Sequence, residues 1–547
     1  MALTCKGGVS AQEATAGRAR YFYNDDLDRP FIFYSAPFQM QHLHDVVDVL
    51  LGTPVTTLVC NSGDDLPYYP SQVAPGIGWR KTALEETDPL YRRRYRVAQE
   101  IRAQGVDVLA VIRDRARAKG LEFVPSLRMN DGHFGQRYPP AENPATSKFW
   151  WDHQHLALGR SDPSMTGFGR YQLDFTHREV REYRLAMIHE LIDGYADDGF
   201  EMDFTRHNSY FPRGKARPEL ITDLVRDARR RLDQRGKRAG RHLPLMVRVL
   251  ANLSPSRAAT PEEKKAHICC PLELSLRTGL DIREWIRAAY IDRLVVADPT
   301  RIMGMDRPLD KFLEAARGSA CTVYASPETR AHRAEGKATL EMYRAAWTNY
   351  FALGQHGTYV FNFFTRHWPL TPEDYGLLRD LTSPDTLRGK NKLYVATRES
   401  FLEPPNLPLP LGGSQRDGSL RILILEDLDS ARRQQILKRV LLRLRVEGLR
   451  EQDQLEVTWN GQPLGSGAAE VERVDFPWYQ KQPGWSVDQS IVKGPFVWLV
   501  WDITGRETLR GVNNAGVRLA AAGSEVRVSG LEVPIEYDAD PSPVRSP

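Results

Sequence analysis

The chain has 547 residues, of which 41% are hydrophobic and 26% are charged, and this ordinary globular composition excludes a disordered or collagen-like protein. Its 74 Lys and Arg residues nearly balance its 70 Asp and Glu residues, for a net charge of +4, which argues against a dedicated nucleic-acid-binding protein. No apolar run approaches the roughly 20 residues that cross a bilayer, so no membrane span is expected. The first 20 residues lack the apolar segment of a signal peptide, and the sequence does not settle the cellular location.

The five cysteines also restrict the class of protein. An odd and small number of cysteines in a chain of this length is not a disulfide framework. No two of them have the C-x-x-C spacing of a structural zinc site, and we expect neither a metal nor another cofactor.

The first two thirds of the chain alternate between apolar strand-like runs and amphipathic helical stretches, the pattern of a parallel α/β fold. Eight runs are strand-like, and eight strands separated by helices are typical of a (β/α)8 TIM barrel. A doubly wound sheet is the structural alternative, but no G-x-G-x-x-G follows the first run. The expected strands are residues 31–36, 56–60, 123–127, 199–204, 245–250, 293–297, 321–325 and 358–363, and one of the expected helices is 91–119.

After about residue 386 the pattern changes to short strand-like runs separated by turn signals, with little helix. This pattern predicts an all-β sandwich that resembles a jelly roll. We expect an N-terminal extension over residues 1–24, the barrel over 25–385, the sandwich over 386–537, and a disordered tail over 538–547.

Two carboxylates stand in the expected fourth strand. Side chains two apart on a strand share a face, so Glu201 and Asp203 point one way while the apolar residues between and beside them point the other. Burial of two unpaired carboxylates is costly, and carboxyl groups with perturbed pKa values are common at active sites. A salt bridge to Arg206 or Arg128 is the structural alternative. We interpret Asp203 and Glu201 as catalytic.

Polar residues at the ends of the other strands are candidates for the site, because the site of a TIM barrel lies at the carboxyl ends of its strands. Arg128 and Asn130 alternate onto one face after the third strand, although Asn-Asp-Gly also favours a plain turn. Glu328, after the seventh strand, is the best carboxylate outside the fourth. The expected substrate contacts are Asn61, Arg128, Asn130, Asp131, His133, Arg206, His207, Arg248, Asp298, Asn362 and Trp368.

Glycoside hydrolysis fits these residues, because it needs two carboxyl groups that flank the bond to be cleaved. Asp203 with Glu201 or Glu328 meets that need, and the sequence does not choose between retention and inversion. Arginines at several strand ends suggest an anionic sugar as a hypothesis. Nearby aromatic residues are candidate stacking platforms for sugar rings. They are Trp150, Trp151, Tyr68, Tyr69, Trp347 and Trp368.

A metal-dependent amidohydrolase is a weaker alternative. His42 and His44 form a His-x-His pair after the expected first strand, where such barrels begin their metal site. The later strand ends, however, supply Asn and Asp where further histidine ligands are needed.

Several segments resemble the glycosyl-hydrolase-like family 10 barrels and related bacterial glycosidase families. Residues 173–183 (LDFTHREVREY) followed by 198–204 (DGFEMDF) are similar to the helix and strand that carry their D-G-x-x-x-D motif. Residues 279–285 and 295–298 resemble the segment before their sixth strand, and 357–363 resemble their eighth strand. The resemblance covers residues 25–385 and implies a bacterial glycosidase barrel in which Asp203 is the catalytic or sugar-binding acid. Those families often have His or Arg at the position of Glu201.

The sequence therefore predicts a glycoside hydrolase that acts on a poly- or oligosaccharide, with a C-terminal accessory sandwich. A barrel that binds carbohydrate without cleaving it is the alternative from another class, since fold does not fix function. The sugar, the linkage and the oligomeric state are not predicted.

Overall fold

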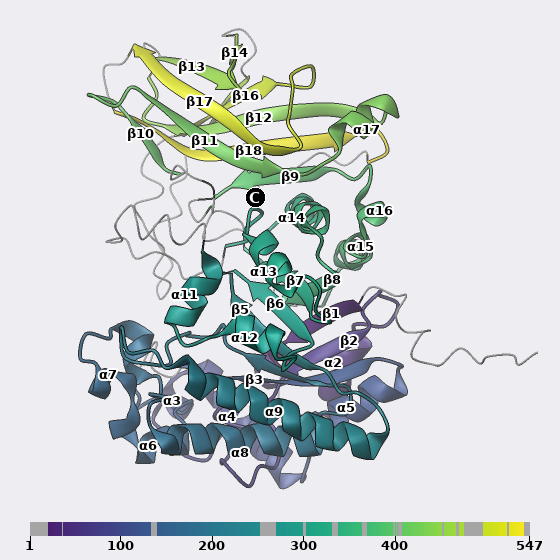
Figure 1. Cartoon of the computed structure of the whole chain (residues 1–547), viewed down its shortest axis with the longest axis vertical. Coiled ribbons are helices and arrows are strands. Elements are labelled where there is room, and N and C mark those ends of the chain that lie inside the picture. Colours follow the sequence, from purple (N-terminus) through teal and green to yellow (C-terminus); the bar gives the residue numbers. More distant parts are fainter. Residues whose placement is uncertain are drawn as a thin grey trace, which may run out of the picture.

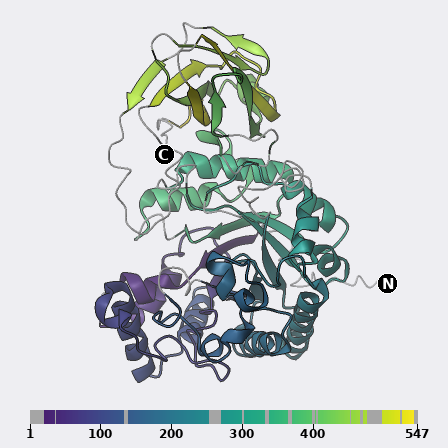
Figure 2. The ribbon, with the colours of Figure 1, turned by 90° about the vertical axis from the view of Figure 1, so that its left-hand side faces the viewer.

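The computed structural model describes residues 20–34, 37–132, 139–251, 270–298, 302–330, 337–363, 369–397, 400, 402, 407–450, 453–465, 470–474, 496–521 and 525–540. Within these ranges no helix is long and apolar enough to cross a membrane. The chain forms a barrel and, stacked on it along the long axis, a β-sandwich (Figures 1 and 2).

Eight parallel strands form the barrel, in the order β7-β6-β5-β4-β3-β2-β1-β8. β8 returns beside β7 and nearly closes the barrel. At this junction the His356 N–H, just before β8, donates to the Val323 carbonyl of β7 at 3.0 Å. The predicted (β/α)8 fold is confirmed. The strands are β1 (Arg20–Asp25), β2 (Thr57–Asn61), β3 (Glu122–Arg128), β4 (Phe200–Asp203), β5 (Leu245–Leu250), β6 (Arg293–Ala297), β7 (Thr322–Ser326) and β8 (Gly357–Phe361).

The position of the first strand corrects the sequence prediction. β1 begins at Arg20, inside the expected N-terminal extension, whereas the expected strand at 31–36 is not one: Arg29–Phe33 is the π-helical turn η1. Pro30 explains the difference, because proline fixes φ and has no N–H to donate to a strand ladder. Residues 35 and 36 lie outside the described ranges.

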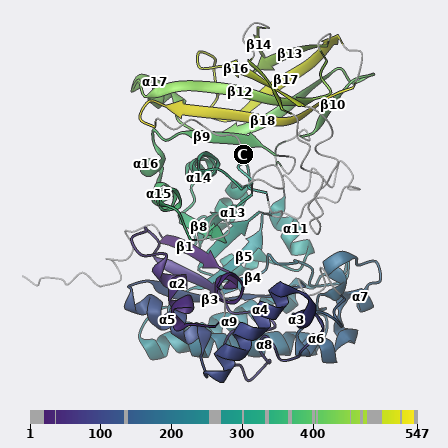
Figure 3. The same cartoon turned by 180° about the vertical axis from the view of Figure 1, so that it is seen from behind.

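Helices surround the strands, as Figures 1 and 3 show. The expected helix at 91–119 is two helices, because Gly105 adopts a left-handed φ of 64° between them. The helical segments are η1, α2 (Met40–Asp48), α3 (Leu84–Thr87), α4 (Pro89–Ala103), α5 (Val108–Ala118), α6 (Lys148–Asp152), η3 (Gln154–Leu156), α7 (Leu158–Ser161), η4 (Gly167–Tyr171), α8 (Arg178–Tyr195), α9 (Pro218–Ala239), α11 (Pro271–Arg277), α12 (Ile282–Arg287), α13 (Leu309–Ala316), α14 (Leu340–Leu353), α15 (Pro372–Asp380) and α16 (Pro384–Leu387).

Two glycines are required by close backbone approach where strands begin. Gly199 precedes β4 with φ 129°, and a Cβ there would lie 2.7 Å from the Pro244 carbonyl oxygen. Gly357 opens β8, and a Cβ there would lie 2.3 Å from the Arg20 carbonyl oxygen. The glycine of the D-G-x-x-x-D segment therefore sets the entry of β4 into the barrel.

The barrel interior is filled in layers. Alternate residues of the strands point inward, and the lower layer is apolar and buried. Above this apolar layer, toward the carboxyl ends of the strands, the inward positions become polar. The apolar cluster consists of Phe22, Val59, Val124, Met246, Val295, Tyr324, Tyr359 and Phe361.

The C-terminal part forms two antiparallel sheets, which confirms the predicted all-β domain. One sheet has the order β10-β18-β12-β16-β15, with β9 also paired to β18, and the other has the order β11-β17-β13-β14. The elements are β9 (Lys392–Ala396), β10 (Leu409–Leu411), β11 (Asp417–Ile424), α17 (Leu428–Arg433), β12 (Leu437–Glu447), β13 (Gln454–Trp459), β14 (Gln462–Leu464), β15 (Glu470–Val474), β16 (Phe496–Asp502), β17 (Gly511–Ala521) and β18 (Val526–Tyr537).

The barrel and the sandwich are joined by buried polar contacts from α14. The Asn349 amide donates to the Met305 carbonyl at 2.9 Å and to the Leu423 carbonyl at 3.0 Å, and its oxygen accepts from the Leu425 N–H at 2.8 Å. Arg344 of the same helix binds Asp540 at 3.0 Å, within the segment expected to be a disordered tail. The rest of that segment, residues 541–547, lies outside the described ranges.

We predict that Asn349→Ala lowers the free energy of unfolding by about 2 to 4 kcal/mol, because it leaves buried backbone groups on both domains without their partner. Urea unfolding followed by tryptophan fluorescence measures the change. Gln434→Ala, which removes an exposed amide, is the matched control and should change stability by no more than about 0.5 kcal/mol. Equal effects of the two substitutions would contradict this role for Asn349.

Candidate active site

Glu201 and Asp203 both point into the barrel, as the alternation of β4 predicts. Glu201 is level with Ser126 of β3, and Asp203 is level with Arg128 of β3 and Arg248 of β5. The intervening apolar residues of β4 pack outward against the helices. The two carboxylates therefore belong to the polar layer that begins where the apolar interior ends.

Glu201 is completely buried and held from three strands. Its carboxyl accepts from Ser126 Oγ at 2.7 Å, from the Tyr359 hydroxyl at 2.8 Å and from Asn24 Nδ2 at 3.4 Å. Burial and the neighbouring charge of Asp203 raise the pKa of Glu201 to about 7. Glu201 can therefore hold a proton near neutral pH, although solvent does not reach it.

Asp203 ends β4 one layer higher. Its Oδ1 accepts from the Thr205 N–H at 2.8 Å, and its Oδ2 lies 3.3 Å from Arg248 Nη1. Arg248 also donates to the Ser326 hydroxyl of β7 at 3.4 Å. Burial lowers the pKa of Arg248, but the charges of Asp203, Glu201 and Glu328 act in the opposite direction, and the net effect is a raised pKa. Arg248 thus brings the carboxylates of β4 close to the loop after β7.

A cavity of about 440 Å³ opens above this layer, at the carboxyl ends of the strands. Loops after β1, β2, β3, β4, β7 and β8 form its wall, the location expected for a TIM-barrel site. Its charged lining residues are Asp26, Asp28, Asp64, Asp65, Asp131, Glu328, Arg94, Arg128, Arg206 and Arg330.

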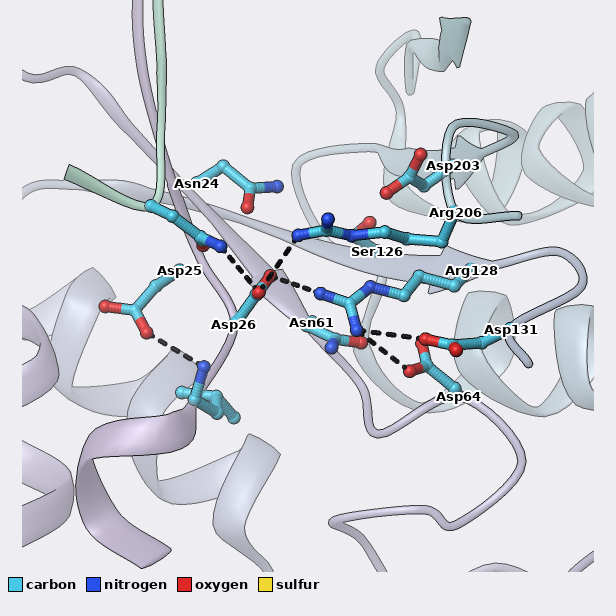
Figure 4. A network of polar contacts seen from close by, with 12 residues as sticks. Asn24, Asp25, Asp26, Asn61, Asp64, Ser126, Arg128, Asp131, Asp203 and Arg206 are labelled. Carbon is cyan, nitrogen blue, oxygen red and sulfur yellow. Dashed lines mark hydrogen bonds and ion pairs between the residues drawn. The ribbon is translucent and has the colours of Figure 1, made fainter. Parts of the chain in front are cut away.

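Arg128 is the centre of the charge network in this cavity (Figure 4). Its guanidinium lies 2.6 Å from Asp26 Oδ1, 3.3 Å from Asp64 Oδ2 and 3.1 Å from Asp131 Oδ2. Only 9% of the Arg128 side chain is exposed, so its charge must be balanced by these carboxylates. One arginine from β3 therefore ties together the loops after β1, β2 and β3.

Asp26 is held in its ionised form. Its Oδ2 accepts from Asn362 Nδ2 at 2.6 Å and lies 3.4 Å from Arg206 Nη2. Burial alone would raise its pKa, but the charges of Arg128 and Arg206 and the bond from Asn362 bring the pKa of Asp26 down to about 2. Asp26 is therefore a carboxylate at any physiological pH.

The pKa of Asp64 is shifted in the opposite direction. Burial raises the pKa of Asp64 well above its usual range and the adjacent carboxylate of Asp131 raises it further, against the lowering effect of Arg128. Asp64 has a left-handed φ of 54°, and a Cβ on the preceding Gly63 would lie 2.5 Å from the Leu66 carbonyl oxygen. The tight turn after β2 thus places on the cavity wall a carboxyl group whose pKa is raised.

The expected site residues fall into four groups in the structure. Asn61, Arg128, Asp131, Arg206, Glu328 and Asn362 line the cavity. Glu201, Asp203 and Arg248 lie in the buried polar layer beneath it. His207 lines a neighbouring cavity. Two further expected residues, His133 and Trp368, belong to none of these groups because they lie outside the described residues.

The fourth group is Asn130 and Asp298, whose contacts are those of positioning residues. The Asn130 amide donates to the Leu173 and Ser209 carbonyls, and its oxygen accepts from the Leu173 N–H. Asp298 pairs with Arg307 and accepts from the Glu328 N–H at 2.9 Å. The structure therefore gives these two residues the task of holding loops, and direct substrate contact remains an untested prediction.

The strand-end arginines that suggest an anionic sugar have protein carboxylates as partners. Arg128, Arg206 and Arg248 are each paired with a carboxylate, and Arg206 and Arg248 also lie over the Phe361 ring at 4.8 Å and 3.8 Å. An anionic sugar would therefore have to compete with protein carboxylates for these guanidinium groups.

Of the expected aromatic platforms, Tyr68 lines the cavity. Trp150, Tyr69 and Trp347 are buried in the hydrophobic core, and Trp151 stacks under Arg80 at 4.1 Å. Burial explains the difference, since tryptophan and tyrosine are used for core packing as readily as for binding.

The His-x-His pair lies on α2, where His42 Nδ1 accepts from the Gln39 N–H at 3.3 Å and caps the helix. Among the described residues, no cluster of three or more His, Cys, Asp or Glu side chains has a metal-binding arrangement.

Asp26, Asp28, Asp64 and Arg94 line the cavity but were not expected from the sequence. Asp26 and Asp28 follow the true first strand, so the misplaced β1 hid them. Asp64 lies three residues beyond the end of β2, and the rule that strand ends carry the site would have included it.

Comparison with protein-family models and with curated proteins finds no match. Among solved structures, the chain is similar to the glycoside hydrolase domain of PgaB (BpsB) from Bordetella bronchiseptica, with 14% identity over 67% of this chain and 99% of that one and a TM-score of 0.38. A Paenibacillus sp. cycloisomaltooligosaccharide glucanotransferase matches with 10% identity over 94% of this chain and a TM-score of 0.35. A GH36 alpha-galactosidase from Geobacillus stearothermophilus matches with 11% identity over 92% of this chain and a TM-score of 0.36.

The chain spans 57% of the glucanotransferase and 56% of the galactosidase. These likenesses are remote.

The raised pKa of Glu201 predicts a pH dependence of stability. An unfolded glutamic acid loses its proton near pH 4.5, whereas folded Glu201 keeps its proton until about pH 7. The folded protein therefore binds more protons in this interval, and Glu201 destabilises it progressively as pH rises from about 4.5 to 7, by at most about 3 kcal/mol.

We expect Glu201→Gln, which is neutral at every pH, to become more stable relative to wild type as pH rises from 5 to 8. Urea unfolding at both pH values measures this difference. A stability difference that does not change with pH would contradict the assignment of this proton to Glu201.

Proposed function

We propose that the protein hydrolyses a glycosidic bond of a poly- or oligosaccharide in the cavity at the carboxyl ends of the barrel strands. The observation that carries this proposal is that one cavity is lined both by Asp26, whose pKa Arg128 and Arg206 hold low, and by Asp64, whose pKa burial and Asp131 raise well above its usual range. Glycoside hydrolysis needs such a division of ionisation between two carboxyl groups.

In this proposal Asp203 is the nucleophile or the general base. It ends β4 in the buried polar layer directly beneath the cavity, one layer above Glu201, and is held by Arg248 and Thr205. The carboxylate either attacks the anomeric carbon or removes a proton from the attacking water. The bond from the anomeric carbon to the leaving oxygen breaks, and one water molecule is consumed.

The proton for the leaving oxygen must come from a carboxylic acid on the other side of the bond. Glu201 and Glu328 are the two donors proposed from the sequence. Glu201 is completely buried and lies one layer below Asp203, and Glu328 lines the cavity within the field of the Arg248 charge. Asp64 combines a raised pKa with a place on the cavity wall, and we propose it as the donor that the geometry supports best.

The first test is a screen of bacterial and algal polysaccharides, both neutral and anionic, for released reducing sugar. We expect wild-type protein to release sugar from at least one of them and Asp203→Asn to lower kcat by at least about 100-fold, as loss of an acid–base group does. Asp114→Asn, on the exposed surface of α5, is the matched control and should retain activity.

Calorimetric binding of a glycan without release of reducing ends would instead indicate a carbohydrate-binding barrel. Unchanged turnover by Asp203→Asn would contradict the role of this carboxylate.

A second prediction identifies the proton donor. Asp64→Asn should lower kcat on the natural glycan by about 10² to 10⁴-fold but leave much of the activity on nitrophenyl glycosides, whose leaving group needs no proton. Glu328→Gln and Glu201→Gln are compared in the same assay. If one of these two shows the selective loss and Asp64→Asn does not, the donor is that glutamate.

A further inference from the structure

A second cavity, of about 620 Å³, lies beside the first and is not used by the proposed chemistry. Residues 165–172 after β3, the loop after β4 and the end of α11 form its wall. Its volume lies in the range of small-molecule binding pockets. We call it the lateral cavity, and its polar lining residues are Thr166, Gln172, His207, Asn208, Ser209, Tyr210, Arg213, Arg277 and Thr278.

One side-chain contact links the walls of the two cavities. Asp131 lines the catalytic cavity and His207 lines the lateral one, and Asp131 Oδ1 lies 3.4 Å from His207 Nδ1. The Gly132 N–H donates to the same histidine nitrogen at 3.0 Å. His207 has a left-handed φ of 50°, a conformation that residues other than glycine rarely adopt and that is often found at functional sites.

The same loops build both cavities, so their relative position is fixed. Asn130, next to Asp131, donates to the carbonyls of Leu173 and Ser209, while Gln172 Nε2 donates to the Asn130 carbonyl at 2.8 Å. Gln172 and Ser209 themselves line the lateral cavity. A ligand that occupies one cavity is therefore held at a constant distance from the other.

The chemistry of the two walls differs. The described wall of the lateral cavity contains no carboxyl group, whereas six carboxyl groups line the catalytic cavity. The lateral cavity is instead lined by apolar surface from Phe211, Pro212 and Leu274 together with amide, hydroxyl and guanidinium groups. This combination suits the apolar face and the hydroxyl rim of a sugar ring, but it lacks the acid that cleavage requires.

We propose that the lateral cavity is a binding subsite for further sugar units of the same substrate chain, which passes over the His207–Asp131 contact into the catalytic cavity. The substrate is then an oligo- or polysaccharide recognised over several units, and not a small glycoside. This inference rests on the proposed function, because it takes the first cavity as the place of cleavage.

The test uses the full-length chain and defined probes: cello-, malto-, galacto- and chito-oligosaccharides of two to six units. Wild type is compared with the double variant Asn208→Ala/Arg277→Ala, which removes two polar groups of the lateral cavity. Arg283→Ala, an exposed arginine on α12 outside the cavity, is the matched control. For each chain length, kcat/KM is measured with Asp203 intact. Calorimetric affinity is measured for the same proteins in the Asp203→Asn background, where the probe is not cleaved.

Without the double substitution, we expect kcat/KM and affinity to rise with chain length in one series of probes. We expect the double variant to lower both quantities about tenfold for the longer members of that series and to leave both unchanged for the disaccharide. Affinity that does not depend on length, or an equal loss on short and long members, would overturn the subsite. If length-dependent binding disappears in the double variant but no probe is cleaved, the subsite stands and the proposed hydrolysis fails.

Discussion

The buried guanidinium of Arg128 is the interaction on which the rest of the site depends. A charge that is nine-tenths buried must be matched by opposite charge, and Arg128 is matched by carboxylates from the loops after β1, β2 and β3. These loops cannot move apart without leaving a buried charge unpaired. The shape of the cavity mouth is therefore set by electrostatics above an apolar barrel interior.

The same network divides the protonation states of the cavity. Asp26, Asp64 and Asp131 supply three carboxyl groups, while Arg128 and Arg206 supply two positive charges, so one retained proton makes the cluster neutral. Asp26 contacts both arginines and stays ionised, and Asp64 stands beside Asp131 and favours its protonated form. A fold that only had to be stable would gain little from this arrangement, because buried ion clusters are costly to assemble.

Much of the fold follows from sequence pattern. The alternation of apolar and acidic residues in β4 correctly places Glu201 and Asp203 inside the barrel, and Gly199 marks the turn that admits this strand. The first strand was misplaced because the apolar residues around Pro30 look like a strand, although proline cannot join a ladder there.

The candidate site is less predictable, because it depends on contacts between distant loops. Asn130 and Asp298 have the residue types of substrate ligands, but their partners are backbone groups and Arg307, which no local pattern reveals. Asp64 becomes a proton-donor candidate because the fold brings Asp131, 67 positions later in the chain, to the same Arg128 guanidinium, where the charge of Asp131 raises the pKa of Asp64. Pairwise charge interactions of this kind are set by the tertiary fold.

We propose that a glycan is cleaved over Arg128, between the carboxyl groups of Asp203 and Asp64. A crystal structure of Asp203→Asn with an oligosaccharide from the polysaccharide that the wild type degrades tests it most directly. We predict an intact glycan chain with one glycosidic oxygen within hydrogen-bonding distance of Asp64 and the adjoining anomeric carbon facing residue 203. A glycan bound elsewhere on the barrel or on the sandwich, with this cavity empty, would contradict it.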